Sequence, residues 1–339
     1  MVTILDGGMS RELQRLGAEL RQPEWSALAL IDAPQIVKQV HREFIDAGSD
    51  VVTTNSYALV PFHIGEERFQ AEGAELIALA GRLAREAADE TQGRKITVAG
   101  SLPPIFGSYE PQLFQPEKVQ DYLSVLVENL APSVDVWLGE TLSLIAEGEA
   151  VRQAVKDTGK PFWISFTLAD ADETAEPALR SGETVEAAAA WAAGSGAQAL
   201  LFNCARPEVM RKAVETAAGV FNDRGVSLEI GVYANAFDTE TDDRAANETL
   251  HGTRADLTDD RYGSFACEWV DAGATMVGGC CGIGAGHIHR LRERLAGWAY
   301  FQANKNPGDR LSGVFAFRCA GGITAAPPTG CRWQRAPAR

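Results

Sequence analysis

Short apolar runs alternate with longer segments of helical character along most of the chain. The runs are four or five residues long and are mostly rich in β-branched or aromatic side chains, as is typical of parallel strands buried on both faces. Eight such runs are present: Val2–Leu5, Val51–Thr54, Ile96–Ala99, Val134–Leu138, Phe162–Phe166, Ala199–Phe202, Leu228–Val232 and Ala274–Val277. The pattern predicts eight strands with helices between them.

Apolar side chains recur at helical spacing in the intervening segments. In the first of these, Ile36, Val37, Val40 and Phe44 fall on one helical face. Several segments end in glycine, the usual residue of a left-handed C-cap. The predicted helices are Pro34–Ala47, Glu66–Thr91, Pro116–Leu130, Thr141–Lys156, Thr184–Ala193, Pro207–Gly219, Asp259–Ala272 and Gly284–Leu295.

Eight alternating strand–helix units predict an α/β fold, specifically a (β/α)8 TIM barrel. An open parallel sheet is the alternative, although no G-x-G-x-x-G fingerprint of a dinucleotide fold follows a strand. We expect residues 1–300 to form one barrel domain. Residues 301–339 are expected to form an irregular tail, because from residue 306 onward the chain is rich in Gly, Pro and Ala and shows no further strand–helix unit.

Charge and cysteine usage narrow the class of protein. The formal net charge of −15 argues against binding to nucleic acid or anionic membranes, so small molecules are the expected partners. No apolar stretch approaches the roughly 18 residues of a membrane span, and the first residues resemble a strand rather than an export signal. A cytoplasmic location follows as an expectation, in which the six cysteines stay reduced. Nothing in the sequence indicates the oligomeric state.

Active sites of such barrels lie at the carboxyl ends of the strands, which selects a short set of residues. Cys204 follows the sixth predicted strand, and Cys280 and Cys281 follow the eighth. Three thiolates provide a soft, nearly complete tetrahedral site that suits zinc, with a fourth position open to a thiol substrate. Gly278 and Gly279 allow the bend that would let adjacent cysteines face one metal ion.

Other cysteines and all five histidines are weaker candidates. Cys267 falls on a predicted helix and is interpreted as a packing residue, and Cys204 considered alone could equally be one. Cys319 and Cys331 lie in the tail and receive no role. None of the histidines lies at a predicted strand end, so we interpret them as surface or packing residues: His41, His63, His251, His287 and His289.

Several motifs in chain order resemble those of the homocysteine S-methyltransferase family over residues 1 to about 297. They are Leu5-Asp6-Gly7-Gly8-Met9, Trp25-Ser26-Ala27, Ala47-Gly48-Ser49-Asp50, Thr53-Thr54-Asn55-Ser56-Tyr57, Gly139-Glu140-Thr141, Ser165-Phe166-Thr167, Asn203-Cys204 and Gly278-Gly279-Cys280-Cys281-Gly282. The last motif is the most specific. The resemblance implies a methyltransferase that converts homocysteine to methionine, with zinc bound by the three cysteines of strands six and eight.

The resemblance also implies the residues that hold the amino-acid end of homocysteine. Asp6 and Glu140 would accept hydrogen bonds from the ammonium group and are the expected catalytic residues, while the N–H groups of Gly7 and Gly8 would meet the carboxylate. Two amides complete the set of expected substrate-binding residues: Asn55 and Asn203. Without the resemblance, Asp6 could simply form a turn and Glu140 could be a charge at a helix N-terminus.

The expected methyl donor is S-methylmethionine, with S-adenosylmethionine second. Betaine-using members place a tyrosine where this chain has Thr141, and cobalamin-dependent members carry further domains for which this chain has no room. Residues 58–62 also differ from the Gln-Ala-Ser that follows the Ser-Tyr in many members. Two alternatives stay open: methylation of another small thiol or a selenol, and a barrel that binds zinc or an amino acid without turnover.

Overall fold

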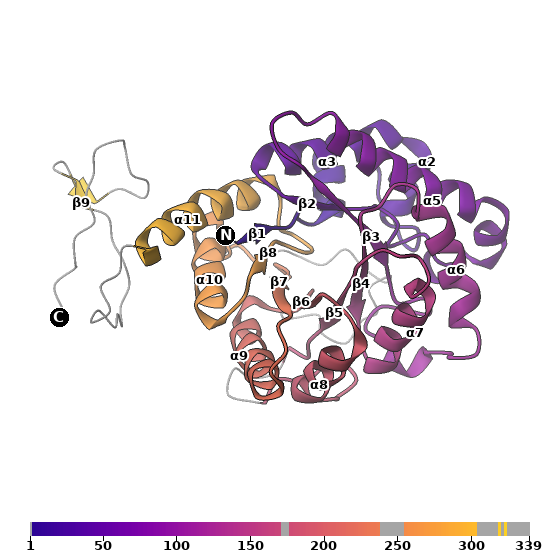
Figure 1. The fold of residues 1–339 in the computed structure, drawn as a ribbon. Helices are drawn as coiled ribbons and strands as arrows, with labels where there is room; N and C mark the ends of the chain where they lie inside the picture. The colour runs from indigo at the N-terminus through magenta and orange to yellow at the C-terminus, as the bar shows by residue number, and fades with distance from the viewer. Residues whose placement is uncertain (1, 171–175, 238–253, 304–317, 320–321, 324–339) are drawn as a thin grey trace. The chain divides into compact units, whose positions relative to one another are not determined.

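Eight parallel strands form a closed barrel surrounded by helices (Figure 1). The computed structural model describes residues 2–170, 176–237, 254–303, 318–319 and 322–323. The hydrogen-bonded order is β1-β8-β7-β6-β5-β4-β3-β2. The strands are β1 (Thr3–Ile4), β2 (Val51–Thr53), β3 (Thr97–Leu102), β4 (Val136–Leu142), β5 (Phe162–Thr167), β6 (Ala199–Asn203), β7 (Glu229–Tyr233) and β8 (Met276–Val277).

The barrel closes between β1 and β2. The Asp50 N–H donates to the Ile4 carbonyl oxygen at 2.7 Å, and the Ile4 N–H donates to the Asp50 carboxylate at 2.9 Å. The Thr53 N–H similarly donates to the Asp6 carboxylate at 2.7 Å. Two aspartates thus join strands that share little backbone pairing, and the (β/α)8 barrel is confirmed over the open-sheet alternative.

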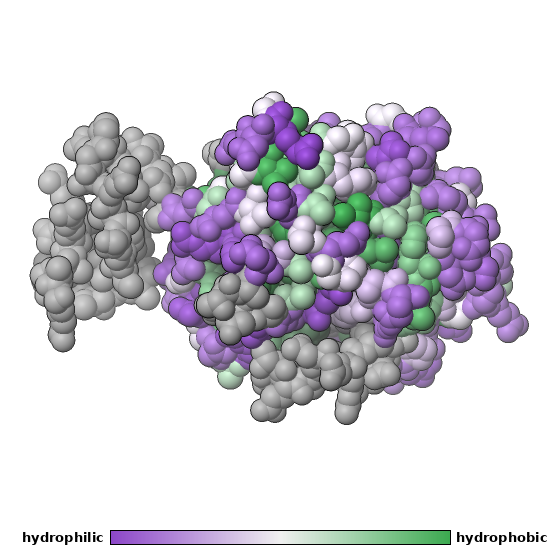
Figure 2. Space-filling view, turned by 90° about the horizontal axis from the view of Figure 1, so that it is seen from below, coloured by the Kyte–Doolittle hydropathy of each residue, from purple (hydrophilic) through white to green (hydrophobic). Residues whose placement is uncertain are grey.

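The helices agree with the predicted pattern, and short additional ones lie in the connecting segments. They are α1 (Met9–Arg15), α2 (Ser26–Asp32), α3 (Pro34–Ala47), α4 (Pro61–Ile64), α5 (Glu66–Asp89), the 3-10 turn η1 (Pro111–Leu113), α6 (Val119–Leu130), α7 (Ile145–Val155), α8 (Val185–Ser195), α9 (Pro207–Arg224), α10 (Asp259–Ala272) and α11 (Ala285–Ala303). Hydrophilic residues cover much of the outer surface in Figure 2, with smaller hydrophobic areas between them.

Several predicted boundaries differ from those in the structure, and the one at the end of the fourth strand matters for the site. The fourth strand continues through Glu140 and Thr141 to Leu142, and the following helix begins at Ile145 rather than at Thr141. The pairing of β4 with β5 shifts register between Gly139 and Leu142. The helix starts where it does because the Glu147 carboxylate accepts the Ser143 and Leu144 N–H groups at 2.6 and 3.3 Å and so caps the first turn.

Side chains alternate between two cores along each strand. The larger core lies between the sheet and the helices. The smaller one fills the barrel interior with Leu5, Val51, Ala99, Val136, Leu138, Trp163, Ala199, Leu201, Tyr233 and Met276. Further along the same inward-facing rows the residues become polar, at Ser101, Glu140, Ser165 and Asn203. The apolar floor therefore supports a buried polar layer at the carboxyl ends of the strands.

The chain divides into two compact units, Met1–Trp298 and Ala299–Arg339. In the second unit, β9 (Arg318–Cys319) pairs antiparallel with β10 (Gly322–Ile323). Most of the tail, including Cys331, lies outside the described residues, as does His251. Among the described residues, no helix has the length and apolar character needed to cross a membrane.

His41 on α3 is fully buried, and neither of its ring nitrogens has a hydrogen-bond partner within the described chain. Burial lowers its pKa from 6.5 to about 4. The unfolded chain therefore binds a proton more readily than the folded one between these values, so acidification through this window destabilises the protein.

We expect His41→Leu to remove about 2 kcal/mol of the stability difference between pH 7 and pH 5.

Urea unfolding of the wild type and His41→Leu at the two pH values measures this contribution. Buried carboxylates also titrate in this range, but they are common to both proteins and cancel in the comparison. An identical loss of stability on acidification in the two proteins would contradict the assignment.

Candidate metal centre and active site

Cys204, Cys280 and Cys281, here called the cysteine triad, converge at the carboxyl end of the barrel. The Cys281 sulfur lies 3.7 Å from that of Cys204 and 4.0 Å from that of Cys280, and all three sulfurs lie within 4.8 Å of one another. A tetrahedral thiolate site with metal–sulfur distances of about 2.3 Å has sulfur–sulfur edges of about 3.8 Å. The triad therefore fits a single metal ion with little rearrangement.

The segment that carries Cys280 and Cys281 is packed too tightly for larger residues. A Cβ atom on Gly279 would lie 2.1 Å from the Ile283 side chain, and one on Gly8 would lie 2.4 Å from the Cys280 carbonyl oxygen. The buried Tyr262 hydroxyl lies 3.1 and 2.8 Å from the carbonyl oxygens of Ala234 and Gly278 and can donate its one proton to either. These contacts fix the loop after β8 against the loops after β1 and β7.

Backbone strain gathers around the triad. Cys204, Thr141 and Tyr109 have φ values of 51°, 60° and 66°, and they are three of the four described non-glycine residues with positive φ. Such conformations cost of the order of 1–3 kcal/mol each and persist only where surrounding contacts enforce them. Here the Cys204 N–H donates to the Tyr233 carbonyl oxygen, and this bond helps hold the bend that turns the thiol towards its partners.

The three thiols do not share charge equally. The pKa of Cys204 is lowered well below its usual value, mainly by hydrogen bonds from Cys280 and Cys281, with further help from Tyr109 and Arg180. The pKa values of Cys280 and Cys281 are raised, because each interacts with the Cys204 thiolate and both are buried. One thiolate is therefore favoured, and the other two need a nearby cation before they lose their protons.

Asp6 and Glu140 form a second charged group in the same buried layer. Burial raises the pKa of each carboxyl to about 7, and the charge of Glu140 contributes to the shift of Asp6. Glu140 accepts hydrogen bonds from the Ser101 hydroxyl at 2.5 Å and the Tyr233 hydroxyl at 3.4 Å. Two desolvated carboxylates that repel each other favour a cationic partner, such as an ammonium group.

Asn203 connects the polar layer to the triad. Its side-chain oxygen accepts from the Ser165 hydroxyl at 2.7 Å and the Thr141 N–H at 3.1 Å. Its amide nitrogen donates to the Thr141 hydroxyl at 2.8 Å and lies 3.9 Å from the Cys280 sulfur. These contacts fix both the bend in β4 and the position of one cysteine.

Other residues expected to bind substrate already have partners within the fold. The Asn55 side chain donates to the Ser26 carbonyl oxygen at 3.1 Å. The Gly8 N–H donates to the Ile283 carbonyl oxygen at 2.8 Å. A Cβ atom on Gly7 would lie 2.4 Å from the same oxygen, so the two glycines permit close packing against the loop after β8. Gly7 is the better candidate of the pair for a carboxylate.

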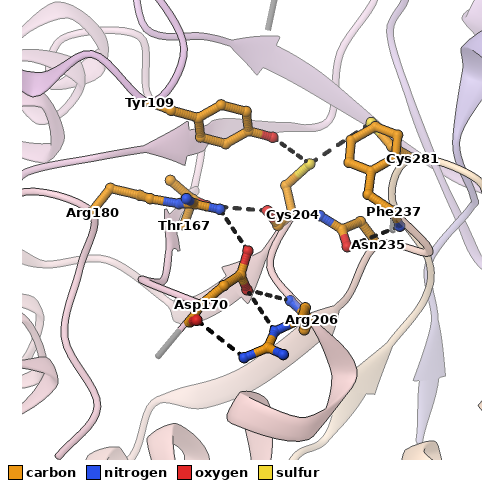
Figure 3. A network of polar contacts seen from close by, with 9 residues as sticks. All are labelled: Tyr109, Thr167, Asp170, Arg180, Cys204, Arg206, Asn235, Phe237 and Cys281. Atoms are coloured by element: carbon orange, nitrogen blue, oxygen red, sulfur yellow. Dashed lines mark hydrogen bonds and ion pairs between the residues drawn. The ribbon is translucent and has the colours of Figure 1, made fainter. Parts of the chain in front are cut away.

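A network that sequence reasoning missed surrounds Cys204 (Figure 3). The Tyr109 hydroxyl donates to the Cys204 sulfur at 2.9 Å. The Arg180 guanidinium carbon lies 4.8 Å from the centroid of the Tyr109 ring, and Arg180 is ion-paired with Asp170 at 2.8 Å. No motif marks these residues. The nearby glycines Gly107 and Gly182, with φ values of 144° and 88°, indicate turns but not a shared site.

Cys267 and the described histidines lie in other settings. Cys267 is on α10, where burial raises its pKa to about 11. His63 is buried on α4 among Trp25, Tyr57 and Phe62. His287 contacts the Leu257 carbonyl oxygen at 3.1 Å. Within the described residues, the triad is the only group of three histidine, cysteine or carboxylate side chains close enough to share a metal ion.

Comparison with known proteins gives a consistent result. The family model described as homocysteine S-methyltransferase matches residues 3–295. Homocysteine S-methyltransferase 1 of Arabidopsis thaliana is 28% identical, with 86% of this chain and 93% of that protein covered. Selenocysteine methyltransferase of Astragalus bisulcatus is 27% identical, with 82% and 88% covered. The metallated form of the homocysteine methyltransferase MmuM from Escherichia coli superposes with a TM-score of 0.69 at 27% identity, covering 86% and 96% of the two chains.

Serine replacements test the metal site. We expect Cys204→Ser, Cys280→Ser and Cys281→Ser each to lose most of the metal, because a neutral hydroxyl cannot replace a thiolate ligand. The wild type should hold about one metal ion per chain under reducing conditions. Elemental analysis of purified, reduced protein gives the ratio.

Cys267→Ser is the matched control, since it removes a thiol outside the triad and should retain the wild-type metal content. Full metal content in any one of the triad variants would remove that cysteine from the ligand set.

Proposed function

This chain belongs to the homocysteine S-methyltransferase family, and on that premise we propose that it transfers a methyl group from a sulfonium donor to the thiol of homocysteine, giving methionine. The observation that carries the proposal is the cysteine triad beside two buried carboxylates at one end of the barrel. The triad suits a thiol activated at a metal ion, and the carboxylates suit the ammonium group of an amino acid.

We propose zinc as the metal, because soft thiolate ligands in a tetrahedral arrangement favour it. Zinc bound to the triad would act as a Lewis acid that favours the thiolate form of an incoming thiol. In this proposal the residues of the chain align the reactants: Asp6 and Glu140 hold the ammonium group, and the Gly7 N–H donates to the carboxylate. Asn203 keeps Cys280 and the bend at Thr141 in place.

The proposed reaction is an in-line displacement. The homocysteine sulfur forms a bond to the methyl carbon, the bond between that carbon and the donor sulfur breaks, and its electron pair stays on the donor. The thiol proton passes to solvent. With S-methylmethionine, the preferred donor in this proposal, both products are methionine; S-adenosylmethionine is second. Orientation of the two sulfurs contributes several kcal/mol to such a step.

The whole candidate site lies within the first compact unit, so we propose that the barrel domain of residues 1–300 carries the reaction. A metal site of three thiolates requires Cys204, Cys280 and Cys281 to stay reduced, so we propose a reducing compartment such as the cytoplasm.

Isotope transfer tests the proposed activity. Zinc-loaded protein given homocysteine labelled in its carbon chain and methyl-labelled S-methylmethionine should produce doubly labelled methionine, whose mass distinguishes it from the methionine left by the donor. Folded, reduced protein with stoichiometric zinc that forms no methionine with either sulfonium donor would contradict the proposal.

In the same assay, Glu140→Gln should raise the KM for homocysteine about 10- to 100-fold, the range for losing a hydrogen bond to a charged group. The reason is specific: the variant loses the carboxylate proposed to hold the ammonium. An analogue of homocysteine that lacks the amino group should therefore react equally well with the wild type and the variant.

Glu147→Gln is the matched control. Glu147 is also buried, with its pKa raised to about 7 by desolvation, but it caps α7 rather than facing the polar layer. We expect lower stability and an unchanged KM for this variant. A KM for homocysteine that is unaffected by Glu140→Gln would remove Glu140 from the substrate site.

A further inference from the structure

Several sulfur nucleophiles would meet in the proposed active site. With zinc bound, three cysteine thiolates would lie beside the sulfur of the proposed substrate, and each could attack the same methyl donor. Methylation of Cys204 would form a bond from its sulfur to the methyl carbon and break the bond between that carbon and the donor sulfur, which keeps the electron pair. The resulting thioether would be a poor metal ligand, so the site needs selectivity among its own sulfurs.

Among the described residues, the Tyr109 hydroxyl makes the shortest hydrogen bond to a sulfur atom of the triad. It donates to the Cys204 sulfur at 2.9 Å, and Figure 3 shows that sulfur between the Tyr109 hydroxyl and Cys281. The contact joins the loop after β3 to the end of β6. By comparison, the Asn203 amide nitrogen lies 3.9 Å from the Cys280 sulfur, so Cys204 receives the stronger hydrogen bond.

The surroundings of Tyr109 hold it rigidly in this position. Its backbone has a φ of 66°, a conformation that is strained for a bulky side chain. The Arg180 guanidinium carbon lies 4.8 Å from the centroid of the Tyr109 ring. Arg180 is ion-paired with Asp170, and the Arg206 backbone N–H holds Asp170 in place by donating to its carboxylate at 2.7 Å. Asp170 has a side-chain exposure of only 6%. A cation over the ring also polarises the hydroxyl towards donation.

We propose that Tyr109 is a positioning residue that lowers the nucleophilicity of Cys204 and so directs methyl transfer to the substrate sulfur. A hydrogen bond to a thiolate withdraws electron density from the lone pair that would attack the methyl carbon. Two of the three sulfur–sulfur distances in the triad, 3.7 and 4.0 Å, are already close to those of a tetrahedral site, so the proposal has Tyr109 keep its hydrogen bond when a metal ion binds. The inference rests on the proposed function and assigns a role to Tyr109, a residue that the proposed function does not itself require.

Tyr109→Phe tests the inference because it removes the hydroxyl and keeps the ring. The zinc-loaded protein is treated with S-methylmethionine without homocysteine, and separately with iodoacetamide, and alkylation of each cysteine is followed by mass spectrometry. We expect Cys204 to be alkylated roughly tenfold faster in the variant, a change of about 1.4 kcal/mol in the barrier. Loss of zinc should follow with the same time course.

Two internal comparisons make the readout specific. Cys267 lies outside the triad and should react at the same rate in both proteins. Tyr57→Phe removes a neighbouring hydroxyl that bonds to Ser108 at 2.5 Å, so it loosens the same loop while leaving the bond to Cys204. Its Cys204 alkylation rate should equal that of the wild type.

Arg180→Gln should give an intermediate increase in the Cys204 alkylation rate, and it serves as the second variant if Tyr109→Phe does not fold.

Equal Cys204 alkylation rates in the wild type and Tyr109→Phe would overturn the inference. So would a Tyr109→Phe protein that folds but binds no zinc, since the hydroxyl would then be needed for metal binding itself. The proposed function could fail while the inference holds. In that case the protein would bind stoichiometric zinc, and Tyr109 would protect Cys204 from iodoacetamide, but homocysteine would not be methylated.

Discussion

The positions of three sulfur atoms are the constraint on which the rest of the site depends. Cys204 and the Cys280–Cys281 pair come from strands separated by β7, so their separation depends on barrel closure and on loop packing. Tyr262 ties the loops after β7 and β8 together, and glycines allow the loop after β1 to pack against them. The strained backbone of Cys204 is the local cost of this convergence.

Negative charge dominates the site, which explains the ligands that it suits. Cys204 is favoured as a thiolate, while Asp6 and Glu140 are desolvated carboxyls with pKa values near neutrality. A metal cation and a substrate ammonium group each relieve one part of this repulsion, and a sulfonium donor adds a third positive charge. Arg180 pairs with Asp170 and lies over the Tyr109 ring, and its positive charge also helps to lower the pKa of Cys204.

The fold was largely predictable because buried parallel strands and capped helices leave strong periodic signals. Because active sites of such barrels lie at the carboxyl ends of the strands, Cys204, Cys280 and Cys281 were expected to lie close together, and in the structure their sulfurs do. The extension of β4 was missed because it depends on Glu147 capping α7 and on Asn203 holding Thr141. Helices α1, α2 and α4 are too short to show a clear helical period of apolar residues. The contact between Tyr109 and Arg180 could not be predicted because it forms only in the folded chain.

Zinc K-edge X-ray absorption of the reduced, zinc-loaded protein, with and without homocysteine, tests the central claim most directly. The account predicts three sulfur ligands at about 2.3 Å and one lighter ligand in the free protein, changing to four sulfurs when homocysteine binds. Four sulfurs before homocysteine is added, or a coordination shell that homocysteine leaves unchanged, would contradict a triad with one position open to the substrate thiol.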